Sequence, residues 1–216
     1  MARATAVFDP DCERCPRLAE FCRSTAERHP GYHGLPVPAF GDAEPRWLIV
    51  GLAPGMHGAN RTGRPFTGDH AGVVLYETLH ALGVSSAKES LTRDDGLRLR
   101  GVRITNAVKC LPPGNKPTPA EIRTCNGYLR AEIAAAAQAR VIVALGRIAH
   151  DAVLDATDSA RGEYRFGHGA EHALADGRIL VDSYHCSRYN TQTRRLTPAM
   201  FLTVLARAQA LAAQMR

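Results

Sequence analysis

The sequence predicts an α/β fold in which a parallel sheet is covered by helices on both faces. Four short apolar runs of strand type occur, at residues 47–50, 102–108, 141–145 and 179–181. They lack the strict alternation of apolar and polar residues that a half-exposed strand shows. Helix-like stretches separate them, as is typical of parallel strands joined by helical crossovers.

The predicted helices cover residues 71–82, 119–139, 147–154 and 198 to the C-terminus. Two of them have well-marked starts. Thr118 and Glu121 form a capping box around Pro119, and Thr197-Pro198 repeats the order of cap and proline. We therefore expect short crossovers and a single domain over residues 1–216.

Composition narrows the class of protein. The 216 residues contain no apolar run near the roughly 20 residues of a membrane span, and the N-terminus has no apolar signal segment. We expect a cytoplasmic protein that does not contact membranes. The net charge of +6 favours a polyanionic partner. However, 24 of the 27 basic residues are arginine, which GC-rich codon usage also produces, and we give that explanation more weight.

Three polar loops follow predicted strands, at residues 51–69, 106–117 and 185–193. Ligands of open α/β sheets bind beyond the carboxyl ends of the strands, so we expect these loops to build one site. The first loop, GLAPGMHGANRTGRPFTGD, has neither the Gly-Lys-Ser/Thr of a P-loop nor the glycine spacing of a dinucleotide fingerprint. Alone, it is a weak signal for phosphate binding.

Four cysteines indicate a metal site. Cys12 and Cys15 form a close pair, and Cys110 and Cys125 form a second. Disulfides are disfavoured in a reducing cytosol, whereas four thiolates hold zinc or a [4Fe–4S] cluster, and the spacing does not separate these two. The alternative is that some are buried apolar thiols, which is our interpretation of Cys22.

The three loops and the cysteines resemble the uracil-DNA glycosylase superfamily, in its iron–sulfur family 5 branch. The first loop resembles the first motif of these enzymes, TNAVKCLPPGNKP the middle motif, and HCSRYNTQTRRLT the last. The resemblance runs from Cys12 to about Thr197. It implies a three-layer α/β/α fold with a four-stranded parallel sheet. It also implies a [4Fe–4S] cluster on Cys12, Cys15, Cys110 and Cys125, with the first pair carried by an N-terminal segment, residues 1–45.

The implied activity is that of a monofunctional hydrolase in DNA base excision repair. Such an enzyme removes uracil, and in family 5 also hypoxanthine and xanthine, by cleaving the N-glycosidic bond and leaving an abasic site. A base inside a duplex is out of reach, so the nucleotide is flipped into a pocket. The partner is then DNA that contains deaminated bases, and we expect a monomer.

The resemblance assigns the base-binding residues. Phe66 matches the position that stacks on the flipped base, and Asn106 the position that reads its Watson–Crick edge, where a reoriented amide could tolerate other oxo-bases. Gly51 and Ala53 belong to the same pocket wall. A core phenylalanine and a turn-capping asparagine are the alternatives.

The resemblance also assigns the chemistry. His185 matches the residue that stabilises the anion of the departing base, although a lone histidine at a strand end is more often structural. Related families carry an acid or amide where Ala53 stands here. Asp69 matches the position that handles water, and it also precedes a helix as an N-cap would. Asn60 is a second candidate for positioning water.

The last motif supplies the predicted DNA contacts, namely Ser187, Arg188, Tyr189 and Asn190, with Arg188 and Tyr189 pressing into the vacated stack. Cys186 stands where the family has proline, which puts the rigidity of this loop in question. Two other functions stay open. One is a catalytically impaired iron–sulfur protein of the same fold that binds DNA. The other is a nucleotide-binding α/β enzyme, which the missing loop lysine and the cysteines argue against.

Overall fold

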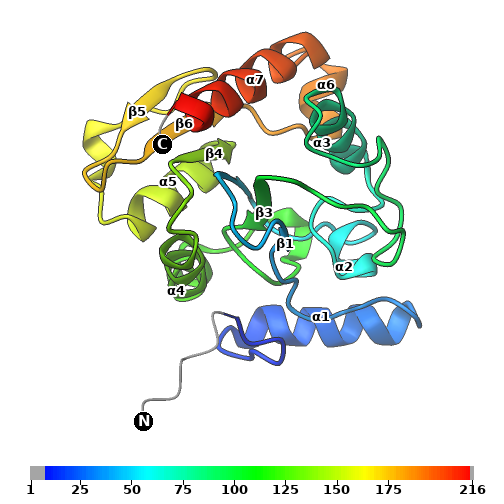
Figure 1. Ribbon diagram of the computed structural model, residues 1–216. Helices are drawn as coiled ribbons and strands as arrows, with labels where there is room; N and C mark the ends of the chain where they lie inside the picture. Colours follow the sequence, from blue (N-terminus) through cyan, green and yellow to red (C-terminus); the bar gives the residue numbers. More distant parts are fainter. Residues whose placement is uncertain (1–7, 215–216) are drawn as a thin grey trace.

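The computed structural model describes residues 8–214 and contains one six-stranded sheet (Figure 1). Its order is β1-β3-β2-β4-β6-β5. The strands are β1 (Phe40–Gly41), β2 (Trp47–Gly51), β3 (Val102–Asn106), β4 (Val141–Leu145), β5 (Glu171–Ala173) and β6 (Ile179–Ser183).

The four strands predicted from the apolar runs are the parallel ones. Strand β2 pairs in parallel with β3 and β4, and β4 pairs in parallel with β6. The four-stranded sheet is nevertheless a wrong prediction, because β1 and β5 add antiparallel edges on β3 and β6. The edge strands β1 and β5 have two and three residues and are only partly buried, so no apolar run in the sequence indicates them. The sheet is therefore mixed.

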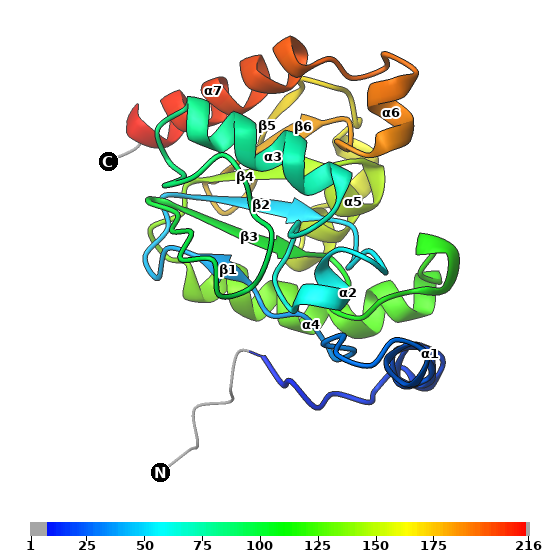
Figure 2. The ribbon, with the colours of Figure 1, turned by 90° about the vertical axis from the view of Figure 1, so that its right-hand side faces the viewer.

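Helices lie on both faces of the sheet. Figure 2 shows α3 and α7 on one face and α4 and α5 on the other, with α1 outside α4. In the described part of the chain the helices are α1 (Pro16–Arg28), α2 (Ala59–Thr62), α3 (His70–Ala81), α4 (Pro119–Ala135), α5 (Arg147–Ala156), α6 (Arg188–Gln192) and α7 (Pro198–Gln214). The four predicted helices are confirmed as α3, α4, α5 and α7, within a few residues at each end.

The sheet is buried on both faces, which explains why its sequence lacks alternation. Along β2, Trp47 and Ile49 pack against α3 and α7, whereas Leu48 and Val50 pack against α4 and α5. All four side chains are at most 2% exposed. Because both faces need apolar residues, a continuous apolar run replaces a period of two.

A third, smaller apolar cluster attaches α1 to α4. Leu18 and Cys22 of α1 pack against Val108, Leu111 and the α4 residue Tyr128. Cys22 is buried, as expected for a small apolar side chain. Of the predicted N-terminal segment 1–45, residues 1–7 lie outside the described part. None of the helices in residues 8–214 combines the length and hydrophobicity that a membrane span needs.

The polar segment 85–99 packs on the body of the protein through the core residues Leu97 and Leu99 and through one buried arginine. The Arg64 side chain is 3% exposed, and its guanidinium binds the Asp95 carboxylate at 2.8 Å and the Ser90 hydroxyl at 2.6 Å. Burial works to raise the pKa of Asp95, but hydrogen bonds from Arg64 and from backbone N–H groups outweigh it and lower the pKa to about 2. The ion pair thus holds segment 85–99 against the loop that precedes α3.

The lowered pKa of Asp95 predicts that the free energy of unfolding depends on pH in the acidic range. The carboxylate contributes fully above its ordinary pKa of 3.8, and the contribution is lost as the pH falls toward about 2. Because solvent screens part of the interaction at this exposed residue, the difference in the free energy of unfolding between wild type and Asp95→Asn should be about 1 kcal/mol at pH 7 and shrink between pH 4 and 2. Urea unfolding measures it, with Asp94→Asn as the exposed neighbouring control. A difference that stays constant with pH contradicts the assignment.

Candidate active site

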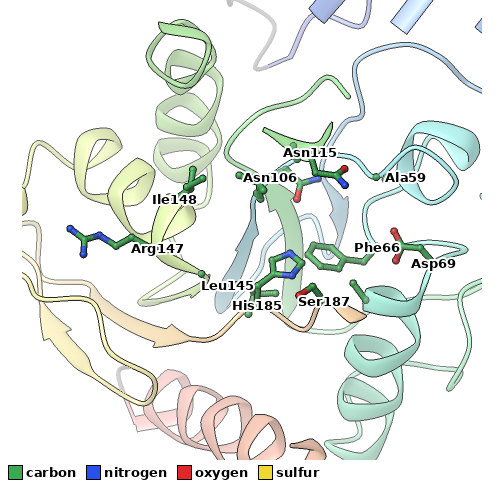
Figure 3. Close-up of a pocket in the computed structure, with 15 residues that line it drawn as sticks. Ala59, Phe66, Asp69, Asn106, Asn115, Leu145, Arg147, Ile148, His185 and Ser187 are labelled. Atoms are coloured by element: carbon green, nitrogen blue, oxygen red, sulfur yellow. The ribbon is translucent and has the colours of Figure 1, made fainter. Parts of the chain in front are cut away.

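A cavity of about 490 Å³ opens where the carboxyl ends of the parallel strands meet (Figure 3). All three polar loops predicted from the sequence contribute to its wall, as does a fourth segment that follows β4. The lining residues are Leu52, Ala53, Gly55, Ala59, Phe66, Asp69, Ala71, Asn106, Asn115, Leu145, Gly146, Arg147, Ile148, His185 and Ser187.

Phe66 forms one wall of this cavity, and Gly51 makes room for it. The Phe66 ring is 7% exposed and lies nearly parallel to the His185 ring, with 5.9 Å between ring centroids. A Cβ atom on Gly51 would lie 2.6 Å from the Phe66 ring and 2.4 Å from the Asn106 amide oxygen. Gly51 therefore lies behind the cavity wall, where any side chain would displace both Phe66 and Asn106.

Asn106 is the last residue of β3 and lines the cavity beside Phe66. The residue is 3% exposed, and its Oδ1 atom is buried with no hydrogen-bond partner among residues 8–214. A buried polar atom without a partner costs free energy, so natural structures rarely retain one without a reason. An amide in this state at the edge of a cavity suits a polar ligand.

Asp69 both caps α3 and faces the cavity. Its Oδ1 accepts a hydrogen bond of 2.9 Å from the Gly72 N–H, so the expected N-cap is confirmed. Its Oδ2 lies against Gly58, where a Cβ atom would come within 2.0 Å. Gly58 thus leaves space for the carboxylate of Asp69, a residue that caps the helix and also lines the cavity.

His185 follows β6 and is half-buried in the cavity wall. Burial lowers the pKa of its imidazole below the ordinary value of 6.5, although the nearby Asp69 carboxylate acts in the opposite direction. The ring is therefore neutral at pH 7. A neutral imidazole carries one N–H, which can donate a hydrogen bond to a ligand atom.

The loop after His185 is held in place by hydrogen bonds, although Cys186 stands where the resemblance predicts proline. Cys186 is fully buried, and its thiol donates to the Ala71 carbonyl at 3.4 Å. The Asn190 amide donates to the His185 carbonyl at 2.7 Å, and His70 contacts the Thr191 hydroxyl at 2.8 Å. These contacts tie the loop to α3. The loop is therefore supported although residue 186 is a cysteine and not a proline.

The other predicted residues lie at the rim or behind the wall. Ser187 lines the cavity and caps α6, and Tyr189 on that helix is 71% exposed. Arg188 is exposed and Asn190 half-buried on the same helix. Asn60 does not line the cavity. It is fully buried in α2, and both polar atoms of its side chain lack partners within the described residues.

The sequence predictions lacked one segment of the wall and one residue of a predicted loop. Gly146, Arg147 and Ile148 follow β4, and Asn115 comes from the loop before α4. The end of β4 could have been found, because the carboxyl ends of parallel strands all meet at this edge. Its residues belong to no recognisable motif and carry little catalytic chemistry. Asn115 has a φ of 57°, which places it in the left-handed region at the tip of a glycine–proline turn.

The four predicted metal ligands come together at α1 and α4. Cys12, Cys15, Cys110 and Cys125 line one small cavity, and the Lys109 backbone N–H donates to the Cys125 sulfur at 3.3 Å. Four cysteine thiols that converge in this way are a donor set that zinc and iron–sulfur clusters both use.

Comparison with known proteins identifies the family of the chain. A family model described as the Uracil DNA glycosylase superfamily matches residues 38–209. A protein of Thermus thermophilus named Type-5 uracil-DNA glycosylase is 52% identical over 93% of this chain and 94% of its own length. One of the same name from Pyrobaculum aerophilum is 44% identical over 93% of this chain and 88% of its own length.

More distant relatives carry a different type number. A Type-4 uracil-DNA glycosylase of Archaeoglobus fulgidus is 37% identical over 56% of this chain and 54% of its own length. The type-5 relatives, in contrast, are matched along nearly their whole length. With its six-stranded sheet, its cavity at the strand ends and these matches, the chain belongs to the uracil DNA glycosylase superfamily, in its type-5 group.

Proposed function

We propose that this protein is a DNA glycosylase that flips uracil, and also hypoxanthine and xanthine, out of DNA and hydrolyses the N-glycosidic bond. The observation that carries the proposal is the cavity in which Phe66, Asn106, Asp69 and His185 meet. The relatives named uracil-DNA glycosylase support the activity on uracil. The volume of about 490 Å³ is that of a pocket for a nucleoside-sized ligand, so it also admits a purine.

The three deaminated bases share the edge that Asn106 would read. Each presents a ring N–H next to a carbonyl, and an amide offers the complementary acceptor and donor side by side. Phe66 supplies an apolar face on which any of the three rings can stack. Binding of the base would also give the Asn106 Oδ1 the partner that the protein itself does not supply. This accounts for a range wider than uracil.

His185 would stabilise the departing base. When the bond between C1′ and the base nitrogen breaks, the electron pair leaves with the base and spreads onto a neighbouring acceptor atom. This atom is the O2 carbonyl of uracil or the N3 nitrogen of a purine. A neutral imidazole donates a hydrogen bond to such an atom, and the interaction strengthens as negative charge develops. The lowered pKa keeps the ring neutral at working pH.

Asp69 would position the attacking water. It is the one carboxylate among the described residues that line the cavity, and Ala53 offers no polar group in the first turn of the loop. Water adds to C1′ of the sugar cation, and the carboxylate accepts its proton as the new C–O bond forms. The positive charge of the sugar is stabilised by the same carboxylate.

The DNA would lie across the cavity mouth beside α6. Ser187, Arg188 and Asn190 would contact phosphates, and the exposed Tyr189 ring would fill the space that the flipped base leaves. The net charge of +6 favours the approach of a polyanion.

We also assign the cysteine site to a [4Fe–4S] cluster. Its four ligands come from the N-terminal segment, from the loop after β3 and from α4, and four thiolates are the usual ligand set of such a cluster. The cluster would supply a structural cross-link and take no part in breaking the glycosidic bond. The Cys125 sulfur already accepts a backbone hydrogen bond, as sulfur ligands of such clusters commonly do.

The alternative is a protein of the same fold that binds damaged DNA without catalysis. The presence of both Asp69 and His185 in the cavity favours the enzyme. An assay of base release decides between the two, because binding to uracil-containing duplex without release of uracil is the result that only the alternative explains.

Substitution of Asp69 should separate catalysis from folding. Asparagine is also a good N-cap, so Asp69→Asn should keep α3 intact while it removes the carboxylate. We expect kcat for uracil release to fall roughly 10²- to 10⁴-fold with little change in thermal stability. Asp42→Asn, at a carboxylate outside the cavity that also accepts backbone hydrogen bonds, is the control. Unchanged kcat in Asp69→Asn would contradict the assignment.

His185 and Asn106 should give different signatures on a panel of uracil, hypoxanthine and xanthine duplexes. His185→Ala removes transition-state stabilisation for every base, so kcat should fall about 10²-fold or more throughout. Asn106→Ala removes recognition of the shared edge, so the ratios between bases should change as well. Equal profiles for the two variants would count against separate roles.

Purified protein should be brown, with broad visible absorbance and about four iron atoms per chain. Cys12→Ser should lose the iron and the absorbance and should unfold at a lower temperature. Cys22→Ser, at a buried cysteine outside the proposed ligand set, should keep both. Colourless protein that contains zinc in place of iron would overturn the cluster.

A further inference from the structure

Lys109 is a buried lysine that lies between the predicted base-reading residue and the cysteine site. It is 1% exposed. Its ammonium group donates to the Glu132 carboxylate at 2.7 Å, to the backbone carbonyl of Asn106 at 3.0 Å and to the Thr105 hydroxyl. All three donor positions of the ammonium are therefore used inside the protein.

Stability alone does not explain why a buried ion pair occupies these two positions. Removing a lysine and a glutamate from water costs several kcal/mol per ion, and replacement of such pairs by apolar residues is often neutral or stabilising. Glu132 lies on α4 and also accepts from the Thr105 hydroxyl at 2.7 Å, so the network links α4 to the end of β3. A role in positioning the end of β3 explains why this network contains two charged residues.

The contact with Asn106 is the one that reaches the cavity. The Asn106 side chain makes no hydrogen bond that holds its Oδ1, as far as the described residues show. Its backbone carbonyl, in contrast, is held by the Lys109 ammonium. The chain leaves β3 at this residue, and the backbone N–H of Lys109 is itself held by the Cys125 sulfur. Lys109 thus fixes the peptide that orients the Asn106 amide.

We propose that Lys109, through its ion pair with Glu132, is a positioning residue that aims the Asn106 amide at the edge of the flipped base. The inference rests on the proposed role of Asn106. Errors of about 1 Å in the placement of a catalytic group can cost a hundredfold in rate, so the loss of this support should be visible in kinetics.

The test is the charge-neutral double variant Lys109→Met/Glu132→Gln, which leaves no unpaired buried charge. We expect thermal unfolding and metal content near those of wild type, with kcat/KM for uracil lowered about ten- to a hundredfold and the ratio of uracil to hypoxanthine release changed. The matched control is Arg178→Met/Asp176→Asn, a partly buried pair at the opposite end of the sheet. This control variant should leave kcat/KM for uracil and the ratio of uracil to hypoxanthine release unchanged.

A double-mutant cycle with Asn106→Ala distinguishes positioning from a general structural effect. If Lys109 acts through Asn106, the double variant costs little further activity in the Asn106→Ala background. An equal fold-loss in both backgrounds, or full activity with unchanged base ratios, overturns the proposal. Lys109→Gln keeps a donor for Glu132 on a shorter side chain and is judged by the same criteria if the double variant does not fold.

The outcomes also separate this inference from the proposed function. Wild-type protein that releases no base would remove the function itself. Full activity of Asn106→Ala would remove the role of Asn106, and with it this inference. Impaired Asn106→Ala beside a fully active Lys109→Met/Glu132→Gln would remove only the inference.

Discussion

The site depends on one constraint, which is that four neighbouring strands run in parallel and end at the same edge. The register pairs Gly51 with Asn106 across β2 and β3, so the glycine lies directly behind the amide and the Phe66 ring. Strand β6 ends at the same edge and places His185 beside the Phe66 ring. Residues that are more than a hundred positions apart in the chain meet because their strands end together.

Buried polar contacts then hold the loops that leave this edge. Asp69 is fixed by its hydrogen bond to α3, and the loop before it is held by Arg64 against segment 85–99. Lys109 fixes the chain after β3, and the Cys186 thiol fixes the chain after β6. A reactive constellation has to be held to within fractions of an ångström, and charge-assisted and hydrogen-bonded contacts provide that precision better than apolar packing.

Much of this could be predicted from sequence, and the failures have physical reasons. The four central strands have five residues each and are mostly apolar, so their type and position were predictable, whereas β1 and β5 are two and three residues long and carry no hydrophobic pattern. Phe66, Asn106, Asp69 and His185 were predictable because motifs surround them. The segment at Arg147 follows a strand without such a motif. The complete burial of Asn60 depends on tertiary packing that no local pattern encodes.

The most direct measurement is a crystal structure with duplex DNA that contains 2′-fluoro-2′-deoxyuridine, whose fluorine slows cleavage of the glycosidic bond. The account predicts an extrahelical uracil in the cavity, stacked on Phe66, with the Asn106 amide at its N3–H and O4 edge. It predicts His185 near O2 and a water between Asp69 and C1′. A base that stays stacked in the duplex, or one seated outside this cavity, would contradict the account.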